Sequence, residues 1–357
     1  MMSIIKKVKK IGIQTILKRL YSPRPLEQHI QKDMKSKKQK VEAFIDKELT
    51  FDKDKIIAAA IQVNLQLHKS TIEYYEHMKL LTEKAVNKGA QLITFPENIH
   101  FLLLGIIPMF EKQLNKEKSF IKQGSSNEMR EQFFLLGPYI EKIFDLTFST
   151  LARKYQVYIM AGSITVPVGN QISNIAYLYD PSGKCLGTQR KLHATPLEEG
   201  FGLDVGNELN VISLPFGKIA FPVCMDATYF ETFYLAREQG ADIVVIPIAN
   251  NEEYDFYKAF RGTWHRVQEA RVFGIKSALV GKMGDLVFTG KSGIFAPIDL
   301  TPQKDGVIQE AQTYDKEEIV VGEVDLATLR TYREEDPLLS DSNQELYDKY
   351  LSLYNPL

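Results

Sequence analysis

The sequence predicts an α/β domain, because apolar runs typical of buried strands alternate along most of the chain with stretches typical of helices. Its 357 residues, 44% hydrophobic and 25% charged, are enough to bury a sizeable core in one large domain. Only two cysteines occur, which excludes a disulfide framework and indicates a reducing, cytoplasmic compartment. The six histidines are scattered and no cysteine pair has zinc-like spacing, so we expect no metal and no other cofactor.

The expected elements alternate in chain order. A strand is expected at 56–65 because the segment is almost entirely apolar, and a helix at 71–87 follows it. Short apolar runs predict the next strands, and longer mixed stretches predict the helices between them. These later strands are expected at 92–95, 157–162, 176–179, 186–191, 211–214, 219–223, 243–247, 275–280 and 319–324, and the later helices at 139–154, 229–239 and 264–273.

Three chemically capable side chains lie at ends of expected strands. Glu97 follows the run 92–95, Lys191 closes the run 186–191, and Cys224 follows the run 219–223 just before a helix. Strand ends are where open α/β architectures collect catalytic groups. A cysteine in such a turn can have backbone N–H groups and a helix N-terminus near its sulfur, which favours a thiolate and an oxyanion hole. Cys185 has no acid–base company and is expected to be a packing residue.

The segments that hold these residues resemble the nitrilase, or carbon–nitrogen hydrolase, superfamily, in its amidase-like branch. The resemblance rests on FPEN (95–98), RKLH (190–193) and VCMD (223–226). Further landmarks at 89–93, 181–184, 240–247, 290–297 and 318–325 extend it over residues 55–333. The resemblance implies a four-layer α-β-β-α sandwich, a Glu97–Lys191–Cys224 triad, a small-molecule amide substrate and a homo-oligomer, either a dimer or larger.

The implied chemistry is hydrolysis of a non-peptide carbon–nitrogen bond in a linear amide. Cys224 would attack the carbonyl carbon to form a thioester, with Glu97 moving the protons. Lys191 and the backbone N–H of Met225 would hold the oxyanion. The pair Met225-Asp226 differs from the pattern typical of nitrile-hydrolysing members, which argues against nitriles. Two alternatives remain: acyl transfer to an amine, and a non-catalytic binding protein on the same fold.

A second glutamate is expected to orient the lysine or the substrate. The sequence Leu197-Glu-Glu-Gly200 offers two candidates. Glu199 fits better, since a Glu-Gly pair eight residues past the lysine is typical of the amidase branch, but Glu198 also remains open. Thr228 and Phe230 depart from the branch's pattern after the nucleophile, so the particular amide is not predicted.

Three regions lie outside the ordinary family domain or interrupt it: a basic N-terminal extension at 1–50, an insertion at about 101–138, and a C-terminal tail at 334–357. The insertion begins with an apolar run at 101–110. Two interpretations fit this run: a buried cap that packs on the sandwich, or an apolar rim that admits a hydrophobic acyl group or touches a membrane.

The N-terminal extension is strongly basic, with a net charge of +10 over residues 1–40. Ile4, Val8 and Ile11 share one helical face, although Ile13 and Leu17 interrupt that stripe. The segment is too short to span a bilayer. It is either an amphipathic helix on an anionic membrane surface, which would place the protein on the inner face of the membrane through residues 1–22, or a solubilising tail. In either case we expect activity to survive deletion of residues 1–22, and we expect no nucleic-acid partner.

Overall fold

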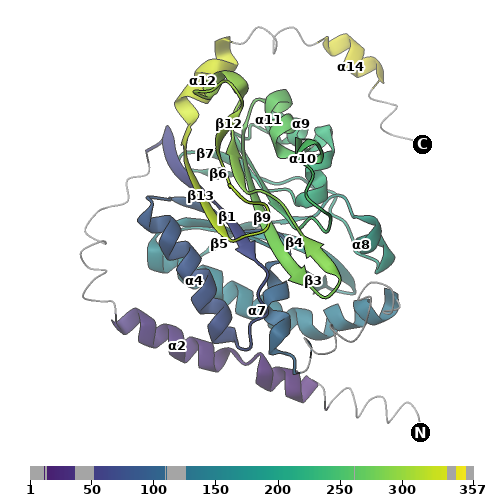
Figure 1. Ribbon diagram of the computed structural model, residues 1–357. Coiled ribbons are helices and arrows are strands. Elements are labelled where there is room, and N and C mark those ends of the chain that lie inside the picture. Colours follow the sequence, from purple (N-terminus) through teal and green to yellow (C-terminus); the bar gives the residue numbers. More distant parts are fainter. Residues whose placement is uncertain are drawn as a thin grey trace.

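The computed structural model describes residues 12, 14–36, 52–108, 110, 126–260, 262–335 and 343–350 (Figure 1). Its strands are β1 (Lys55–Asn64), β2 (Leu92–Thr94), β3 (Tyr158–Val168), β4 (Gln171–Tyr179), β5 (Cys185–Arg190), β6 (Val211–Leu214), β7 (Gly217–Ala220), β8 (Ile243–Ile248), β9 (Phe273–Met283), β10 (Leu286–Phe288), β11 (Gly293–Phe295), β12 (Val307–Glu310) and β13 (Glu318–Asp325). Its α-helices are α2 (Pro23–Ser36), α4 (Thr71–Asn87), α7 (Ser126–Tyr155), α8 (Pro196–Gly200), α9 (Phe230–Glu238), α10 (Phe256–Phe260), α11 (Thr263–Ala270), α12 (Leu326–Glu335) and α14 (Gln344–Tyr350). The 3₁₀ helices within the described ranges are η1 (Ile99–Ile106), η2 (Cys224–Thr228) and η3 (Ile298–Leu300).

The strands form two sheets that are joined at one seam. The hydrogen-bonded path runs β5-β4-β3-β2-β1-β9-β8-β7-β6. At its centre β1 and β9 pair only through Val63 with Leu279 and Asn64 with Val280. On one side of the seam β13 runs antiparallel to β1, and on the other β11 runs antiparallel to β9. Each half is therefore a sheet in its own right.

Four layers follow from the alternation of side chains along these strands. On β1, Ala58 belongs to the core between the two sheets, and its neighbour Ala59 belongs to the core shared with α4 and α7. On β8, Val245 faces the inter-sheet core, whereas Val244 faces the core shared with α9 and α11. Figure 1 shows α4 and α7 on one side of the strands and α9 and α11 on the other. The predicted α-β-β-α sandwich is confirmed.

Several boundaries differ from the sequence-based expectation. Helix α7 begins at Ser126 rather than at 139, so the second part of the expected insertion is the first part of a core helix. The sequence did not predict this early start, because Gly137 and Pro138 interrupt the helical pattern. Helix α11 ends at Ala270, since Arg271 adopts a left-handed conformation, φ 53°, that turns the chain into β9.

The apolar run after Glu97 forms most of η1. Leu102 and Leu103 are completely buried, which fits the interpretation of this run as a cap on the sandwich. Neighbouring side chains of the same run, including Phe101 and Leu104, are only partly buried. The run therefore has one face in the core and another that remains accessible.

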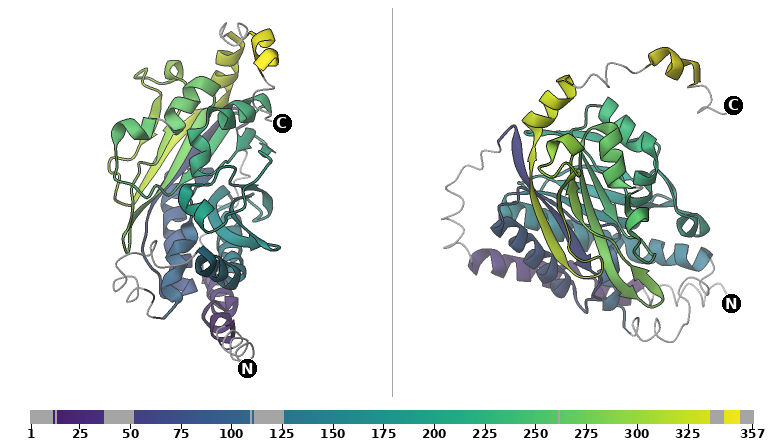
Figure 2. Two further views of the ribbon diagram at one scale, coloured as in Figure 1. Left: turned by 90° about the vertical axis from the view of Figure 1, so that its right-hand side faces the viewer. Right: turned by 45° about the horizontal axis from the view of Figure 1, so that its top comes forward.

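The N-terminal region requires a correction. Residues 14–20 are helical, α2 follows them, and both pack against the domain through Leu17, Tyr21, Leu26 and Ile30. Figure 2 shows α2 in purple alongside the blue helices of this outer layer. The hydroxyl of Tyr21 donates a hydrogen bond to the carbonyl oxygen of Leu103 over 3.0 Å. The expected extension at 1–50 thus includes a part of the core, because its apolar residues continue in helical spacing past residue 14.

The stripe of Ile4, Val8 and Ile11 lies outside the described residues. Among the helices in the described ranges, none combines the length and the apolar character needed to cross a bilayer.

Candidate active site

Glu97 lies just past β2, where the chain passes through Pro96 and leaves the sheet. Its side chain is 2% exposed. Oxygen Oε1 accepts hydrogen bonds from Lys191 Nζ over 2.9 Å and from Asn174 Nδ2 over 2.8 Å. Oxygen Oε2 accepts one from the backbone N–H of Ala249 over 3.0 Å. This carboxylate is therefore held from three directions, which fixes its orientation.

Lys191 is the residue that immediately follows β5. Its backbone N–H donates to the carbonyl oxygen of Asn174 on the neighbouring strand β4, over 2.8 Å. The ammonium is buried between two carboxylates: it contacts Glu97 and both oxygens of Glu198, the latter over 2.8 Å and 2.7 Å. One cation shared by two carboxylates is a strongly charged and fully hydrogen-bonded cluster.

Of the two candidates for the second glutamate, Glu198 contacts Lys191 and Glu199 does not, contrary to the preference for Glu199. Both residues lie on the one-turn helix α8, which Thr195 caps. Glu198 occupies the third position of a capping box, and its Oε2 accepts from the backbone N–H and the hydroxyl of Thr195 over 2.8 Å and 2.9 Å. The cap directs Glu198 inward to Lys191, whereas Glu199, one residue further around the turn, is exposed to solvent.

Cys224 begins η2, just after β7 and Val223. Its φ of +48° lies in the left-handed region, which is strained for a residue with a Cβ and is often found at functional sites. The thiol donates a hydrogen bond to Oδ1 of Asn250 over 3.6 Å. Cys185, by contrast, packs against the core on β5 as expected.

Asp226 joins the cysteine turn to the lysine loop. It is completely buried, and its carboxylate accepts from the backbone N–H of Val223 over 2.8 Å. The same carboxylate accepts from the backbone N–H of Leu192 and of His193 over 3.1 Å and 2.8 Å. Since one side chain bonds the segments before Cys224 and after Lys191, it fixes the distance between the two.

The charges and the burial shift the pKa values of the three groups together. Burial raises the pKa of the Cys224 thiol, and the Glu97 carboxylate adds to this effect while Lys191 opposes it. Burial also raises the pKa of Glu97, against the influence of Lys191. Burial by itself would lower the pKa of Lys191, but Glu97, Cys224 and Glu198 outweigh it and the pKa is raised. The two carboxylates thus favour the charged form of Lys191, and burial favours the protonated form of the thiol.

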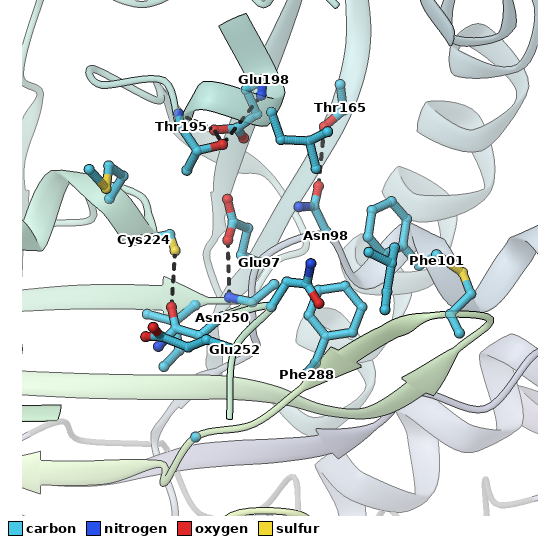
Figure 3. A pocket seen from close by; sticks show the side chains of 18 of the residues that line it. Glu97, Asn98, Phe101, Thr165, Thr195, Glu198, Cys224, Asn250, Glu252 and Phe288 are labelled. Carbon is cyan, nitrogen blue, oxygen red and sulfur yellow. Dashed lines mark hydrogen bonds between the residues drawn. The ribbon is translucent and has the colours of Figure 1, made fainter. Parts of the chain in front are cut away.

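A pocket of about 790 Å³ opens onto this cluster. Glu97, Lys191, Cys224 and Met225 all line it, so the expected site residues share one cavity, with Glu199 as the exception. Figure 3 shows the side chains of Cys224 and Glu97 directed into the same space. No group of three histidine, cysteine, aspartate or glutamate side chains in the described ranges is arranged to hold a metal ion.

Three polar residues of this site were not predicted from the sequence. Asn174, Thr195 and Asn250 contact Glu97, Glu198 and Cys224 respectively. Thr195 carried a readable pattern, because Thr-Pro-Leu-Glu is a capping box with proline at the first helical position. Asn174 and Asn250 carried none, since their roles depend on which strands become neighbours.

A four-layer α-β-β-α fold with a thiol, a carboxylate and an ammonium gathered at strand ends beside one pocket defines the class: a protein of carbon–nitrogen hydrolase type. The chain belongs to the carbon–nitrogen hydrolase family, whose model matches residues 57–334. It is 28% identical over 294 residues to the probable hydrolase YhcX of Bacillus subtilis strain 168, an alignment that covers 80% of this chain and 53% of that protein. The chain therefore spans about half the length of this relative.

Solved structures share the fold. The carbon–nitrogen hydrolase from Helicobacter pylori G27 superposes with a TM-score of 0.64 at 23% identity, covering 84% of this chain and 98% of that one. A variant of the amidase from Nesterenkonia sp. AN1 superposes with a TM-score of 0.59 at 19% identity, covering 85% of this chain and 99% of that one. That structure shows covalent addition of the acetamide moiety of fluoroacetamide at its active-site cysteine.

Proposed function

We propose that this protein hydrolyses a linear amide through a thioester on Cys224. The observation that carries the proposal is the placement of a strained, pocket-lining cysteine beside the buried pair of Glu97 and Lys191. The Oε1 atom of Glu97 and the Nζ atom of Lys191 lie 2.9 Å apart. The cysteine reactivity of the Nesterenkonia amidase supports the same role for this thiol.

In the first half-reaction Glu97 takes the thiol proton as sulfur attacks the carbonyl carbon of the amide. A raised thiol pKa makes this base necessary, because the thiolate is not formed in advance. The tetrahedral oxyanion is stabilised by Lys191 and the backbone N–H of Met225. The carbon–nitrogen bond then breaks, and Glu97 returns the proton to the leaving amine.

In the second half-reaction water attacks the thioester and Glu97 removes a proton from it. The carbon–sulfur bond breaks, the thiol regains a proton, and a carboxylic acid leaves. Lys191 keeps its proton throughout, because its raised pKa makes it a poor acid. Glu198 holds the ammonium between the two carboxylates while Glu97 changes its protonation state.

Intact-mass spectrometry on the full chain, incubated with a panel of simple amides, tests the proposal. We expect an acyl adduct on Cys224 and release of free acid. Cys224→Ala should lose both, and Cys185→Ala, the matched control at the other cysteine, should lose neither. Turnover that persists in Cys224→Ala would contradict the mechanism, and acyl transfer to an added amine in place of free acid would replace hydrolysis by the transferase alternative.

A further inference from the structure

The pocket is much larger than a small amide requires. A volume of about 790 Å³ lies in the range of cavities that enclose a drug-sized ligand. The triad lines only one part of it, and the remainder divides into a polar part and an apolar part. The apolar part is bounded by side chains from η1, α7 and the β9–β10 hairpin, with Phe101, Leu104, Leu136, Met283, Leu286 and Phe288 as principal members.

This apolar lobe, defined by those six residues, is continuous with the catalytic base. Phe101 lies four residues after Glu97, on the 3₁₀ helix that begins at Ile99. Its ring contacts that of Phe288, with centroids 6.1 Å apart, so the wall from η1 meets the wall from β10. Figure 3 shows both rings on the opposite side of Glu97 from Cys224.

The polar groups at this end of the pocket bear no charge. Burial lowers the pKa of His100 to about 3, so its imidazole is neutral at physiological pH. The hydroxyl of Thr165 donates to Oδ1 of Asn98 over 3.1 Å. An ionic substituent would find no counter-ion among these side chains, whereas methylene groups would be removed from water.

Charged groups lie toward the other end. Glu252 is near Asn250 and Cys224 in Figure 3, and Glu253, Asp255 and Lys258 of the same segment also line the pocket. Lys276 and Lys291 also line the pocket, and Lys258 forms an ion pair with Glu252 over 3.8 Å, so the charges are of both signs. The leaving amine is polar and becomes cationic at neutral pH once it is free, so a charged surface suits it better than an apolar wall does. The two ends of the pocket therefore distinguish the two halves of an amide.

We infer that the substrate is an amide of a medium- or long-chain apolar acyl group, with the acyl chain in the lobe and the amine toward residues 252–258. This inference rests on the proposed function and specifies its substrate class. The thioester on Cys224 would then carry a chain that passes Glu97 and lies against the rings of Phe101 and Phe288.

The test is kcat/KM for a series of amides that share one amine and lengthen the acyl chain from three to ten carbons. Each methylene that enters the lobe should raise kcat/KM by roughly three- to fourfold, the ratio that corresponds to ~0.8 kcal/mol per buried methylene. The increase should stop once the lobe is filled. A series that is flat or falling while turnover persists would overturn the inference and leave the proposed function standing, whereas absence of turnover and of a Cys224 adduct at every length would overturn both.

Variants that fill the lobe sharpen the test. Leu104→Trp should lower kcat/KM for the ten-carbon amide at least tenfold more than for the three-carbon amide. Leu136→Trp makes the same test from α7 if the first variant does not fold, as judged by its thermal melt. The matched control is Leu80→Trp on α4, at a leucine 47% exposed and outside the pocket, which should leave the whole series unchanged. Equal losses for short and long amides in both folded lobe variants would overturn the placement of the acyl chain.

Discussion

Replacing Glu198 by glutamine should separate the placement of Lys191 from its charge. Glutamine keeps the shape and one acceptor oxygen but removes the negative charge that both Glu198 oxygens present to the ammonium over 2.8 Å and 2.7 Å. A hydrogen bond to a charged group contributes about 1.5–3 kcal/mol. If that energy serves to hold Lys191 where the oxyanion forms, its loss lowers kcat/KM roughly 10- to 150-fold.

Glu199→Gln is the matched control on the same one-turn helix. Its side chain is exposed, so the expected change is no more than about 0.5 kcal/mol in the free energy of unfolding and none in kcat/KM. The assay is steady-state amide hydrolysis together with urea unfolding of each variant. Near-normal kcat/KM in Glu198→Gln, or a loss in Glu199→Gln, would refute the assignment of the second glutamate.

Two further predictions concern buried charges. Glu97 must be ionised to accept the thiol proton, and its pKa is raised. We therefore expect kcat/KM to fall with decreasing pH at an apparent pKa above the ordinary glutamate value of about 4.3. A pH profile in which kcat/KM falls only at or below that value would contradict the role of Glu97 as the base. Lys276 on β9 is 7% exposed with its ammonium over the Phe295 ring, and it forms no ion pair with the described residues. Burial lowers its pKa, so Lys276→Met should increase the free energy of unfolding by at least about 1 kcal/mol at pH 7. The unfolded chain binds the Lys276 proton more tightly than the folded chain does, so the free energy of unfolding of the wild type rises with pH as the pH approaches the ordinary lysine pKa of about 10.4 from below. Denaturant titrations should therefore show that the difference in the free energy of unfolding between Lys276→Met and the wild type becomes smaller over that pH range.

The proximity of the three proposed catalytic side chains was predictable because each follows a strand in sequence, and strand ends meet at one edge of a fold. Glu97, Lys191 and Cys224 therefore needed only local patterns and the family resemblance. Asn174 depends on register: β4 and β5 pair antiparallel with Ile175 opposite Arg190, which brings Asn174 beside Lys191. No local pattern specifies that pairing, so its role could be found only in three dimensions.

The choice between Glu198 and Glu199 shows a different limit. Adjacent residues on a helix point about 100° apart, so a single turn decides which one is buried. The family resemblance predicted a glutamate in this pair, and the helix cap at Thr195 determines which of the two points toward Lys191. The capping box was readable in the sequence, and it would have favoured Glu198, whose side chain at the third position returns to the cap.

The N-terminus combines two features that the sequence alone did not separate. Leu17 is 6% exposed and lines the pocket, and Tyr21 is 1% exposed and bonded to η1. Deleting residues 1–22 would therefore expose the core beneath η1, contrary to the expectation that activity survives. Lys6, Lys7, Lys9 and Lys10, by contrast, precede every described residue.

Two truncations should distinguish these features. At about 1 kcal/mol per basic residue near an anionic surface, four lysines can hold the protein reversibly on such a membrane at low salt. We expect full-length protein to co-sediment with anionic vesicles, and deletion of residues 1–11 to abolish this while leaving the melting temperature and small-amide hydrolysis unchanged. Deletion of residues 1–22 should lower both the melting temperature and the rate of small-amide hydrolysis. It removes two core side chains that each contribute roughly 2–5 kcal/mol to the free energy of unfolding. Vesicle binding that survives the shorter deletion would place the membrane contact elsewhere. Unchanged stability in the longer deletion would mean that Leu17 and Tyr21 do not support the wall of the pocket.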